Sequence, residues 1–131
     1  MSLVYLASPY TSYVYGKFWA YDHACRAAAR IALADIPVYS PIVQGHVISQ
    51  RMPEMPHDFW MRHCEPVMAA ADRCVILMID GWLTSKGVLA EWRFFTERKV
   101  PLCFMTPQHL DNASDDELRE ILVPTQQGYS L

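Results

Sequence analysis

Short apolar segments alternate along the chain with longer segments in which apolar residues recur at helical spacing. Each short segment is a nearly continuous run rich in Val, Ile, Leu, Tyr or Phe, a pattern typical of parallel strands that are covered on both faces. These segments predict strands at residues 3–7, 36–39, 74–79 and 101–105. Helical periodicity predicts helices at residues 17–34, 58–71, 85–98 and 114–122. Strands that alternate with helices predict an α/β fold with a doubly wound parallel sheet.

Two features of the chain qualify this pattern. Pro66 lies within the second predicted helix, and we expect it to interrupt or restart that helix. The connection between residues 39 and 58 is long and rich in Pro and Gly, as is typical of functional or flexible loops. No repeat, low-complexity tract or linker divides the sequence, so we expect a single domain over residues 1–131.

Composition narrows the classes of protein to consider. Hydrophobic residues make up 52% of the 131 residues and charged residues 19%, which excludes intrinsic disorder. The net charge is -3 and no segment concentrates basic residues, so we expect no nucleic-acid polymer as a partner. No apolar run approaches the roughly 20 residues of a membrane span, and no basic region precedes the apolar start, so we expect neither a membrane nor secretion. The four cysteines form no CxxC pair, which favours free thiols and a cytoplasmic location.

In a doubly wound sheet, ligands bind beyond the carboxyl ends of the strands, where the strand order reverses. The segments that follow the first three predicted strands are residues 8–10, 40–42 and 80–82. We therefore expect the chemistry of this protein among these three segments.

The start of the third predicted helix has features of an anion site. Thr84 or Ser85 is a natural N-cap, and Gly87 leaves the first backbone N–H groups uncovered. The positive end of the helix dipole and the charge of Lys86 would both favour an anion there. The alternative is an ordinary capped helix start.

Glu91 lies on the same helix, at the border of the apolar face formed by Val88, Trp92 and Phe95. It stands too far into the helix to complete a capping box. Its carboxyl group therefore points either to solvent or into a cleft above the sheet.

Asp72 supplies a second acid, which we expect close to the same edge as Glu91. Two carboxyl groups in different environments can divide glycosyl chemistry between a nucleophile and a proton donor. The alternative for Asp72 is a helix-to-strand turn residue that pairs with Arg73 or with a backbone amide. Tyr5 could place its hydroxyl group against Glu91 if the first strand neighbours the third, although any buried tyrosine needs some partner.

Other candidates carry weaker signals. His57, His63 and Cys64 lie close together with His46 upstream, but none has the spacing of a metal site, so we expect neither a metal nor another cofactor. His46 is interpreted as a substrate contact or a surface residue. Trp60 could stack on a base, or it could belong to the core or to a subunit interface. The abundance of large apolar residues suggests a homo-oligomer, either a dimer or a tetramer.

Taken in order, these motifs resemble the nucleoside 2-deoxyribosyltransferase-like superfamily, and most closely its small bacterial and phage branch. The resemblance covers roughly residues 3–105 and rests on the order and spacing of the motifs. It is carried by VYLASPY at residues 4–10, YSPI at 39–42 with Gly45-His46, ADRCVIL at 71–77, and then Gly81-Trp82, Ser85-Lys86-Gly87 and Glu91.

The resemblance implies a flavodoxin-like fold, a three-layer sandwich around a parallel sheet of four to five strands. It implies cleavage or transfer of the N-glycosidic bond of a nucleoside or nucleotide through a covalent glycosyl-Glu91 intermediate. Tyr5 would orient the Glu91 carboxylate, and Asp72 would contact the base and help to protonate it. The implied substrate-binding residues are Ser8, Pro9, Tyr10, Pro41, His46, Gly81, Trp82, Ser85, Lys86 and Gly87.

Ser85 discriminates within the superfamily. Transferases of free nucleosides tend to carry an acid six residues before the nucleophile, whereas relatives that hydrolyse nucleoside 5′-monophosphates carry a serine there. The resemblance therefore favours a nucleotide substrate over a free nucleoside. The alternative is a non-catalytic module that binds or senses nucleotides on the same fold.

The sequence also departs from the superfamily pattern. Pro9 removes one N–H group from the turn after the first strand, and Val88 follows Gly87 where better-studied members have another glycine. Residues 111–131 match no recognisable element. In the superfamily that region, or a neighbouring subunit, often closes the pocket.

Overall fold

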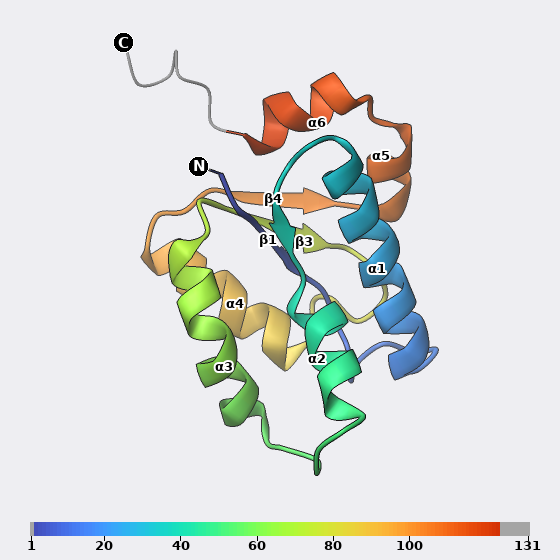
Figure 1. Ribbon diagram of the computed structural model, residues 1–131, viewed down its shortest axis with the longest axis vertical. Helices are drawn as coiled ribbons and strands as arrows, with labels where there is room; N and C mark the ends of the chain where they lie inside the picture. Colours follow the sequence, from blue (N-terminus) through green and yellow to red (C-terminus); the bar gives the residue numbers. More distant parts are fainter. Residues whose placement is uncertain (1, 124–131) are drawn as a thin grey trace.

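The computed structural model describes residues 2–123 and contains a four-stranded, all-parallel sheet (Figure 1). Its strand order is β2-β1-β3-β4, so the order reverses between β1 and β3. Tyr5, in the middle of β1, lies in register between Tyr39 of β2 and Cys74 of β3. The strands are β1 (Val4–Ala7), β2 (Val38–Tyr39), β3 (Arg73–Leu77) and β4 (Leu102–Met105). The predicted α/β class and the parallel, doubly wound sheet are confirmed.

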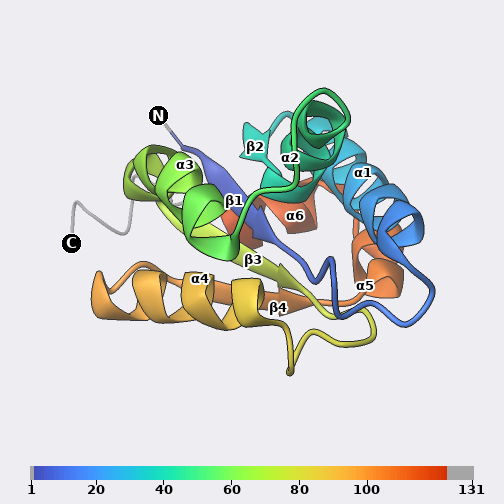
Figure 2. The ribbon, with the colours of Figure 1, turned by 90° about the horizontal axis from the view of Figure 1, so that it is seen from below.

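Helices cover both faces of this sheet, which gives a three-layer, flavodoxin-like sandwich (Figure 2). The helices α1, α5 and α6 lie on one face and α3 and α4 on the other, while α2 packs against α1. The helices are α1 (Lys17–Leu33), α2 (Pro41–Ser49), α3 (His57–Ala70), α4 (Lys86–Glu97), α5 (Pro107–Asn112) and α6 (Asp115–Leu122). Within residues 2–123, none of the helices combines the length and apolarity needed to cross a membrane.

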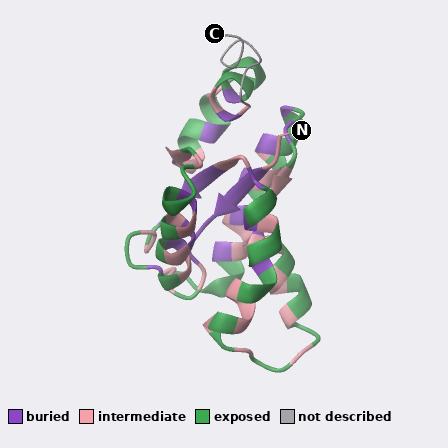
Figure 3. Cartoon of the chain, turned by 90° about the vertical axis from the view of Figure 1, so that its left-hand side faces the viewer, coloured by how far each residue is buried: buried purple, intermediate pink, exposed green. Residues whose placement is uncertain are grey.

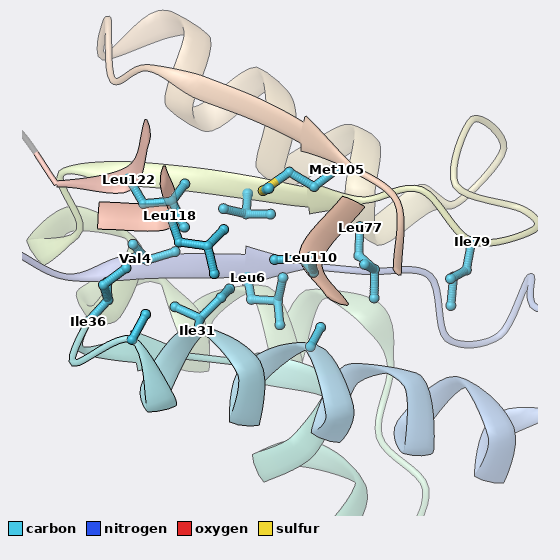
Figure 4. Packing of buried hydrophobic residues seen from close by; sticks show 13 residues of the cluster. Val4, Leu6, Ile31, Ile36, Leu77, Ile79, Met105, Leu110, Leu118 and Leu122 are labelled. Carbon is cyan, nitrogen blue, oxygen red and sulfur yellow. The ribbon is translucent and has the colours of Figure 1, made fainter. Parts of the chain in front are cut away.

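Alternation along β1 divides the core between the two faces, because successive side chains of a strand point in opposite directions. Val4 and Leu6 pack with Ile31 of α1 and Leu118 of α6 in an apolar cluster (Figure 4). Tyr5 and Ala7 pack on the opposite face, against α3 and α4. Figure 3 shows the strands buried, with exposed residues on the outer sides of the helices. Burial of each large aliphatic side chain contributes about 1.5–3 kcal/mol, so both clusters are needed to hold the layers together.

The segment predicted as a long loop contains the helix α2, so that prediction is wrong in part. Ser40 caps the helix by accepting a hydrogen bond from the Val43 amide at 3.2 Å, and Pro41 occupies the first helical position. Apolar residues are spread around α2 and none of its residues is fully buried, so no helical stripe marks it in the sequence.

The prediction that Pro66 breaks the second helix is also wrong, because α3 runs through it. Proline removes the hydrogen bond to the carbonyl group four residues earlier, which here belongs to Arg62. Both Pro66 and Arg62 are exposed, so water can reach the carbonyl group that loses its partner.

The C-terminal segment up to residue 123 completes the layer around α1. The short helix α5 was not predicted, whereas α6 has the predicted position and begins with a capping box between Ser114 and Glu117. Leu118 and Leu122 of α6 are fully buried in the α1 cluster. This part of residues 111–131 therefore covers the core, and the remainder lies outside the described residues.

Candidate active site

A cavity of about 330 Å³ lies where strands end and helices begin. Its size is at the lower end of the roughly 300–1,000 Å³ found for small-molecule sites. The starts of four helices contribute to it: Lys17 of α1, Pro41 of α2, His57 of α3 and Lys86 of α4. The predicted site residues that line it are Ser8, Tyr10, Pro41, His46, Ser85, Lys86, Gly87 and Glu91.

Glu91 faces this cavity from the middle of α4 and is bonded to Tyr5 behind it. The Glu91 residue is only 6% exposed, and its Oε2 accepts a hydrogen bond from the Tyr5 hydroxyl group at 2.5 Å. Tyr5 is fully buried, with its ring between those of Tyr39 (5.9 Å) and Phe95 (5.4 Å). The predicted pairing of these two side chains is therefore present, and packing fixes the tyrosine that holds the carboxyl group.

Burial controls the ionisation of this pair. Desolvation raises the pKa of Glu91 to about 8, and the hydrogen bond from Tyr5 acts in the opposite direction. Burial, followed by the nearby Glu91 charge, raises the pKa of Tyr5. In the empty protein at neutral pH, Glu91 is therefore largely a neutral acid. Perturbed titratable groups in a cavity are typical of functional sites.

Cys64 of α3 borders the same pair. It is buried, lines the cavity and packs in the cluster that contains Tyr5. Burial raises the pKa of its thiol group, which is therefore uncharged at neutral pH. No local pattern in the sequence indicates that Cys64 lies near Glu91, because only the packing of α3 beside α4 brings the two residues together.

The start of α4 has the predicted capped geometry. The Ser85 hydroxyl group accepts a hydrogen bond from the Val88 amide at 3.2 Å, which leaves the amides of Lys86 and Gly87 at the exposed helix start. A β-carbon placed on Gly87 would meet only Ser85 Oγ, at 3.9 Å, so the space beside this backbone is open to a ligand. Val88, found in place of a second glycine, is fully buried in the core.

Polar groups from the loop after β1 and from α1 line the same cavity. Ser8 is 3% exposed and lines the cavity, and its hydroxyl group has no hydrogen-bond partner within residues 2–123. The ammonium group of Lys17 lies 5.6 Å from the centre of the Tyr10 ring. Together with Lys86, Lys17 makes this part of the cavity suitable for an anion.

His46 is a cavity residue with a fixed ring. Its Nδ1 lies 2.7 Å from the Tyr10 hydroxyl oxygen, within hydrogen-bonding distance. Its imidazole ring also stacks on Tyr21, with ring centres 4.2 Å apart. The interpretation of His46 as a substrate contact rather than a surface residue stays a prediction, to which the structure adds that the residue lines the cavity.

An apolar wall closes another part of the cavity. Trp60 and Met61 supply it from α3, and Met55 supplies it from the preceding connection. A β-carbon placed on Gly45 of α2 would be in van der Waals contact with the Trp60 ring at 3.7 Å, so α2 and α3 touch at this part of the cavity wall. The sequence alone does not assign Trp60 to a binding site, because an aromatic residue at a helical position is more often part of a core.

The structure does not bring Asp72 to the cavity, so the expected neighbourhood of the two acids is wrong. Asp72 precedes β3 and therefore lies at the amino end of the sheet, opposite the carboxyl ends. Its Oδ1 accepts a hydrogen bond from the Leu3 amide at 3.0 Å, and its own amide donates to the Leu3 carbonyl group at 3.1 Å. Asp72 acts here as the turn residue of the alternative interpretation.

Three further predicted binding residues, Pro9, Gly81 and Trp82, do not line the cavity either. Gly81 has a φ of 90°, and a β-carbon there would come within 2.6 Å of the Ser12 carbonyl oxygen, so this turn requires glycine. Trp82 packs against Trp92 and Phe104, with ring centres 6.2 and 5.8 Å away. Gly81 and Trp82 therefore shape the turn and the core.

Potential metal ligands are scattered. Within the described residues, no three His, Cys, Asp or Glu side chains gather in a group that could hold a metal ion. The cavity is lined by carboxyl, imidazole, hydroxyl, thiol and ammonium groups.

Comparison with known proteins gives one match. A family model described as a domain of unknown function (DUF1937) matches residues 2–107. This range contains β1 to β4 and every residue that lines the cavity. A search of curated proteins found no match.

Proposed function

We propose that this chain, which belongs to the DUF1937 family, cleaves or transfers the N-glycosidic bond of a nucleoside or nucleoside 5′-monophosphate through a covalent glycosyl-Glu91 intermediate. One observation carries the proposal: a buried carboxyl group reaches the main cavity and is held by a buried tyrosine. A glutamate with only a structural role would not need to border an open cavity.

The reaction follows from this geometry. The Glu91 carboxylate forms a bond to the anomeric carbon while the bond from that carbon to the base nitrogen breaks, and the electron pair leaves with the base. The Tyr5 hydroxyl group holds one carboxyl oxygen and leaves the other for attack. The neutral Glu91 acid first loses its proton to water, and the ionised form then attacks, stabilised by the positive charge that develops on the sugar. Water or a second base then releases the sugar.

The anion-binding groups support a phosphorylated substrate. The free amides at the start of α4, the Ser8 hydroxyl group and the ammonium groups of Lys17 and Lys86 border one cavity. Backbone N–H groups at a helix start and ammonium groups are typical ligands of phosphate. A 5′-phosphate bound there would place the attached sugar toward Glu91.

The apolar wall supports an aromatic base. The face of Trp60, with Met61 and Met55 beside it, offers a surface on which a base can stack. The cavity volume of about 330 Å³ suits one nucleotide better than a dinucleotide or a polymer.

A second candidate function is a module that binds nucleotides without cleaving them. It is favoured by the position of Asp72, the acid implied for the leaving base, at the far end of the sheet. Both candidates use the same cavity, so only chemistry separates them.

The test is chromatographic. The protein is incubated with ribo- and deoxyribonucleosides and their 5′-monophosphates, and free base is measured. We expect base release by the wild-type protein and a loss of at least about 10³-fold in Glu91→Gln. The matched control is Glu97→Gln, which changes an exposed glutamate of the same helix and should leave the rate unchanged.

Quenched reactions should also contain protein whose mass is increased by one sugar phosphate. Thermal stabilisation by a nucleotide without base release would favour the binding module. Full activity of Glu91→Gln would overturn the assigned nucleophile.

A further inference from the structure

Cleavage of an N-glycosidic bond leaves an electron pair on the base, and a proton donor normally neutralises it. Asp72 cannot reach the cavity from the amino end of the sheet. Glu91 is committed to the bond with the sugar and must be ionised to form it. The proposed function therefore needs another side chain that can give a proton to the base.

His46 has the geometry of such a group. The Tyr10 hydroxyl group lies 2.7 Å from its Nδ1, and Tyr21 stacks on its ring at 4.2 Å, so both the position and the plane of the imidazole are fixed. Within residues 2–123, no hydrogen bond joins Nε2 to the protein. A catalytic histidine is commonly held in this way, with one ring nitrogen anchored and the other left for the substrate. The ammonium group of Lys17 lies 5.6 Å from the Tyr10 ring centre.

The position of His46 also matches the end of the cavity assigned to the base. Its chain neighbour Gly45 lies against the Trp60 ring, since an added β-carbon would be in van der Waals contact with it at 3.7 Å, and both residues line the cavity. The imidazole and the indole therefore border the same part of the cavity. His46 reaches the cavity from α2, which packs against α1, whereas Glu91 reaches it from α4, which packs beside α3.

The other titratable groups of this region are less suited to the role. Glu54 is exposed, and within the described residues no hydrogen bond or ring contact fixes the side chain of His57. Burial raises the pKa of the Cys64 thiol group, which makes it a poor proton donor.

We infer that His46 is the general acid and base of the proposed reaction. Protonated His46 gives its Nε2 proton to the base as the bond between sugar and base breaks and the bond between sugar and Glu91 forms. The neutral imidazole then takes a proton from the attacking water, or from the incoming base, as the glycosyl-Glu91 bond breaks. Each turnover returns both residues to their starting forms. This inference rests on the proposed function.

The test compares two leaving groups on one sugar phosphate. The first substrate is the nucleotide that the wild-type protein cleaves fastest. The second is the 4-nitrophenyl glycoside of the same 5-phosphorylated sugar, whose leaving group departs as a stable anion and needs no proton. We expect His46→Gln to lower kcat about 10²- to 10⁴-fold with the nucleotide and only a few-fold with the nitrophenyl compound. His109→Gln, at an exposed histidine of α5, is the matched control.

The outcomes separate the two proposals. An equal loss with both substrates would overturn the inference and make His46 a binding or structural residue, and so would an unchanged rate with the nucleotide. In either case Glu91→Gln should still be inactive, so the proposed function would stand. If the wild-type protein releases neither leaving group, the proposed function fails and the role of His46 fails with it.

Discussion

The two faces of the sheet bury different kinds of side chain, although the same strands contribute to both. Toward α1, α5 and α6, the core cluster consists of hydrophobic side chains such as Leu6, Ile31 and Leu118. Toward α3 and α4, the buried groups include a phenol, a thiol and a carboxyl group, from Tyr5, Cys64 and Glu91. The first face is held mainly by apolar packing, whereas the second also holds polar groups whose burial costs stability unless they are hydrogen-bonded. Residues that only stabilise the fold therefore fill one face of the sheet, and the buried pair of the candidate site, Tyr5 and Glu91, lies on the other.

The largest effect on stability is expected from the apolar face. Leu6→Ala removes a fully buried side chain beside Tyr5 in sequence but on the opposite face, and should lower the free energy of unfolding by about 2–5 kcal/mol. Urea denaturation measures it. Leu33→Ala, at a leucine that is 76% exposed, is the control and should change stability by less than about 0.5 kcal/mol. A cost below about 1 kcal/mol at Leu6 would contradict the role of this face.

The next effect concerns the buried acid and depends on pH. The pKa of Glu91 in the folded protein is about 8, above its ordinary value of 4.5. The stabilisation of the neutral acid is therefore fully present below about pH 4.5 and is lost as the pH rises through about 8. Relative to the wild type, Glu91→Gln should gain on the order of 3 kcal/mol between about pH 5 and pH 9. Denaturation curves at several pH values measure this gain, with Glu97→Gln as the control. A difference that does not change with pH would place Glu91 in water.

The smallest effect on stability is expected at Tyr5, which donates the hydrogen bond to Glu91. Tyr5→Phe keeps the buried ring and removes the hydroxyl group, so it should cost about 1 kcal/mol of stability near neutral pH. Because the hydrogen bond from Tyr5 lowers the pKa of Glu91, its loss should move the ascending limb of the pH–rate profile to higher pH. The profile of base release checks this shift. An unchanged profile with a lower rate at every pH would show that Tyr5 acts through packing alone.

Local pattern in the sequence determined most of the fold and part of the site. Continuous apolar runs marked the four strands, and the spacing of Val88, Trp92 and Phe95 placed Glu91 at the edge of a buried face. The helix cap at Ser85 could be predicted from the sequence, because a cap depends on residues only three positions apart. The pairing of Tyr5 with Glu91 needed one further assumption, that β1 neighbours β3, and the strand order satisfies it.

Only the tertiary structure decided which polar residues meet. Asp72 and Glu91 are both acids near β3, but the direction of the strand places Asp72 at the amino end and leaves Glu91 at the cavity. His46 and Trp60 line the cavity because α2 and α3 contact each other beside it. No pattern in the sequence indicates that these two helices meet. The position of a helix or strand can be predicted from the local spacing of apolar residues, whereas a site depends on how whole elements pack, and that arrangement is settled by burial summed over the entire chain.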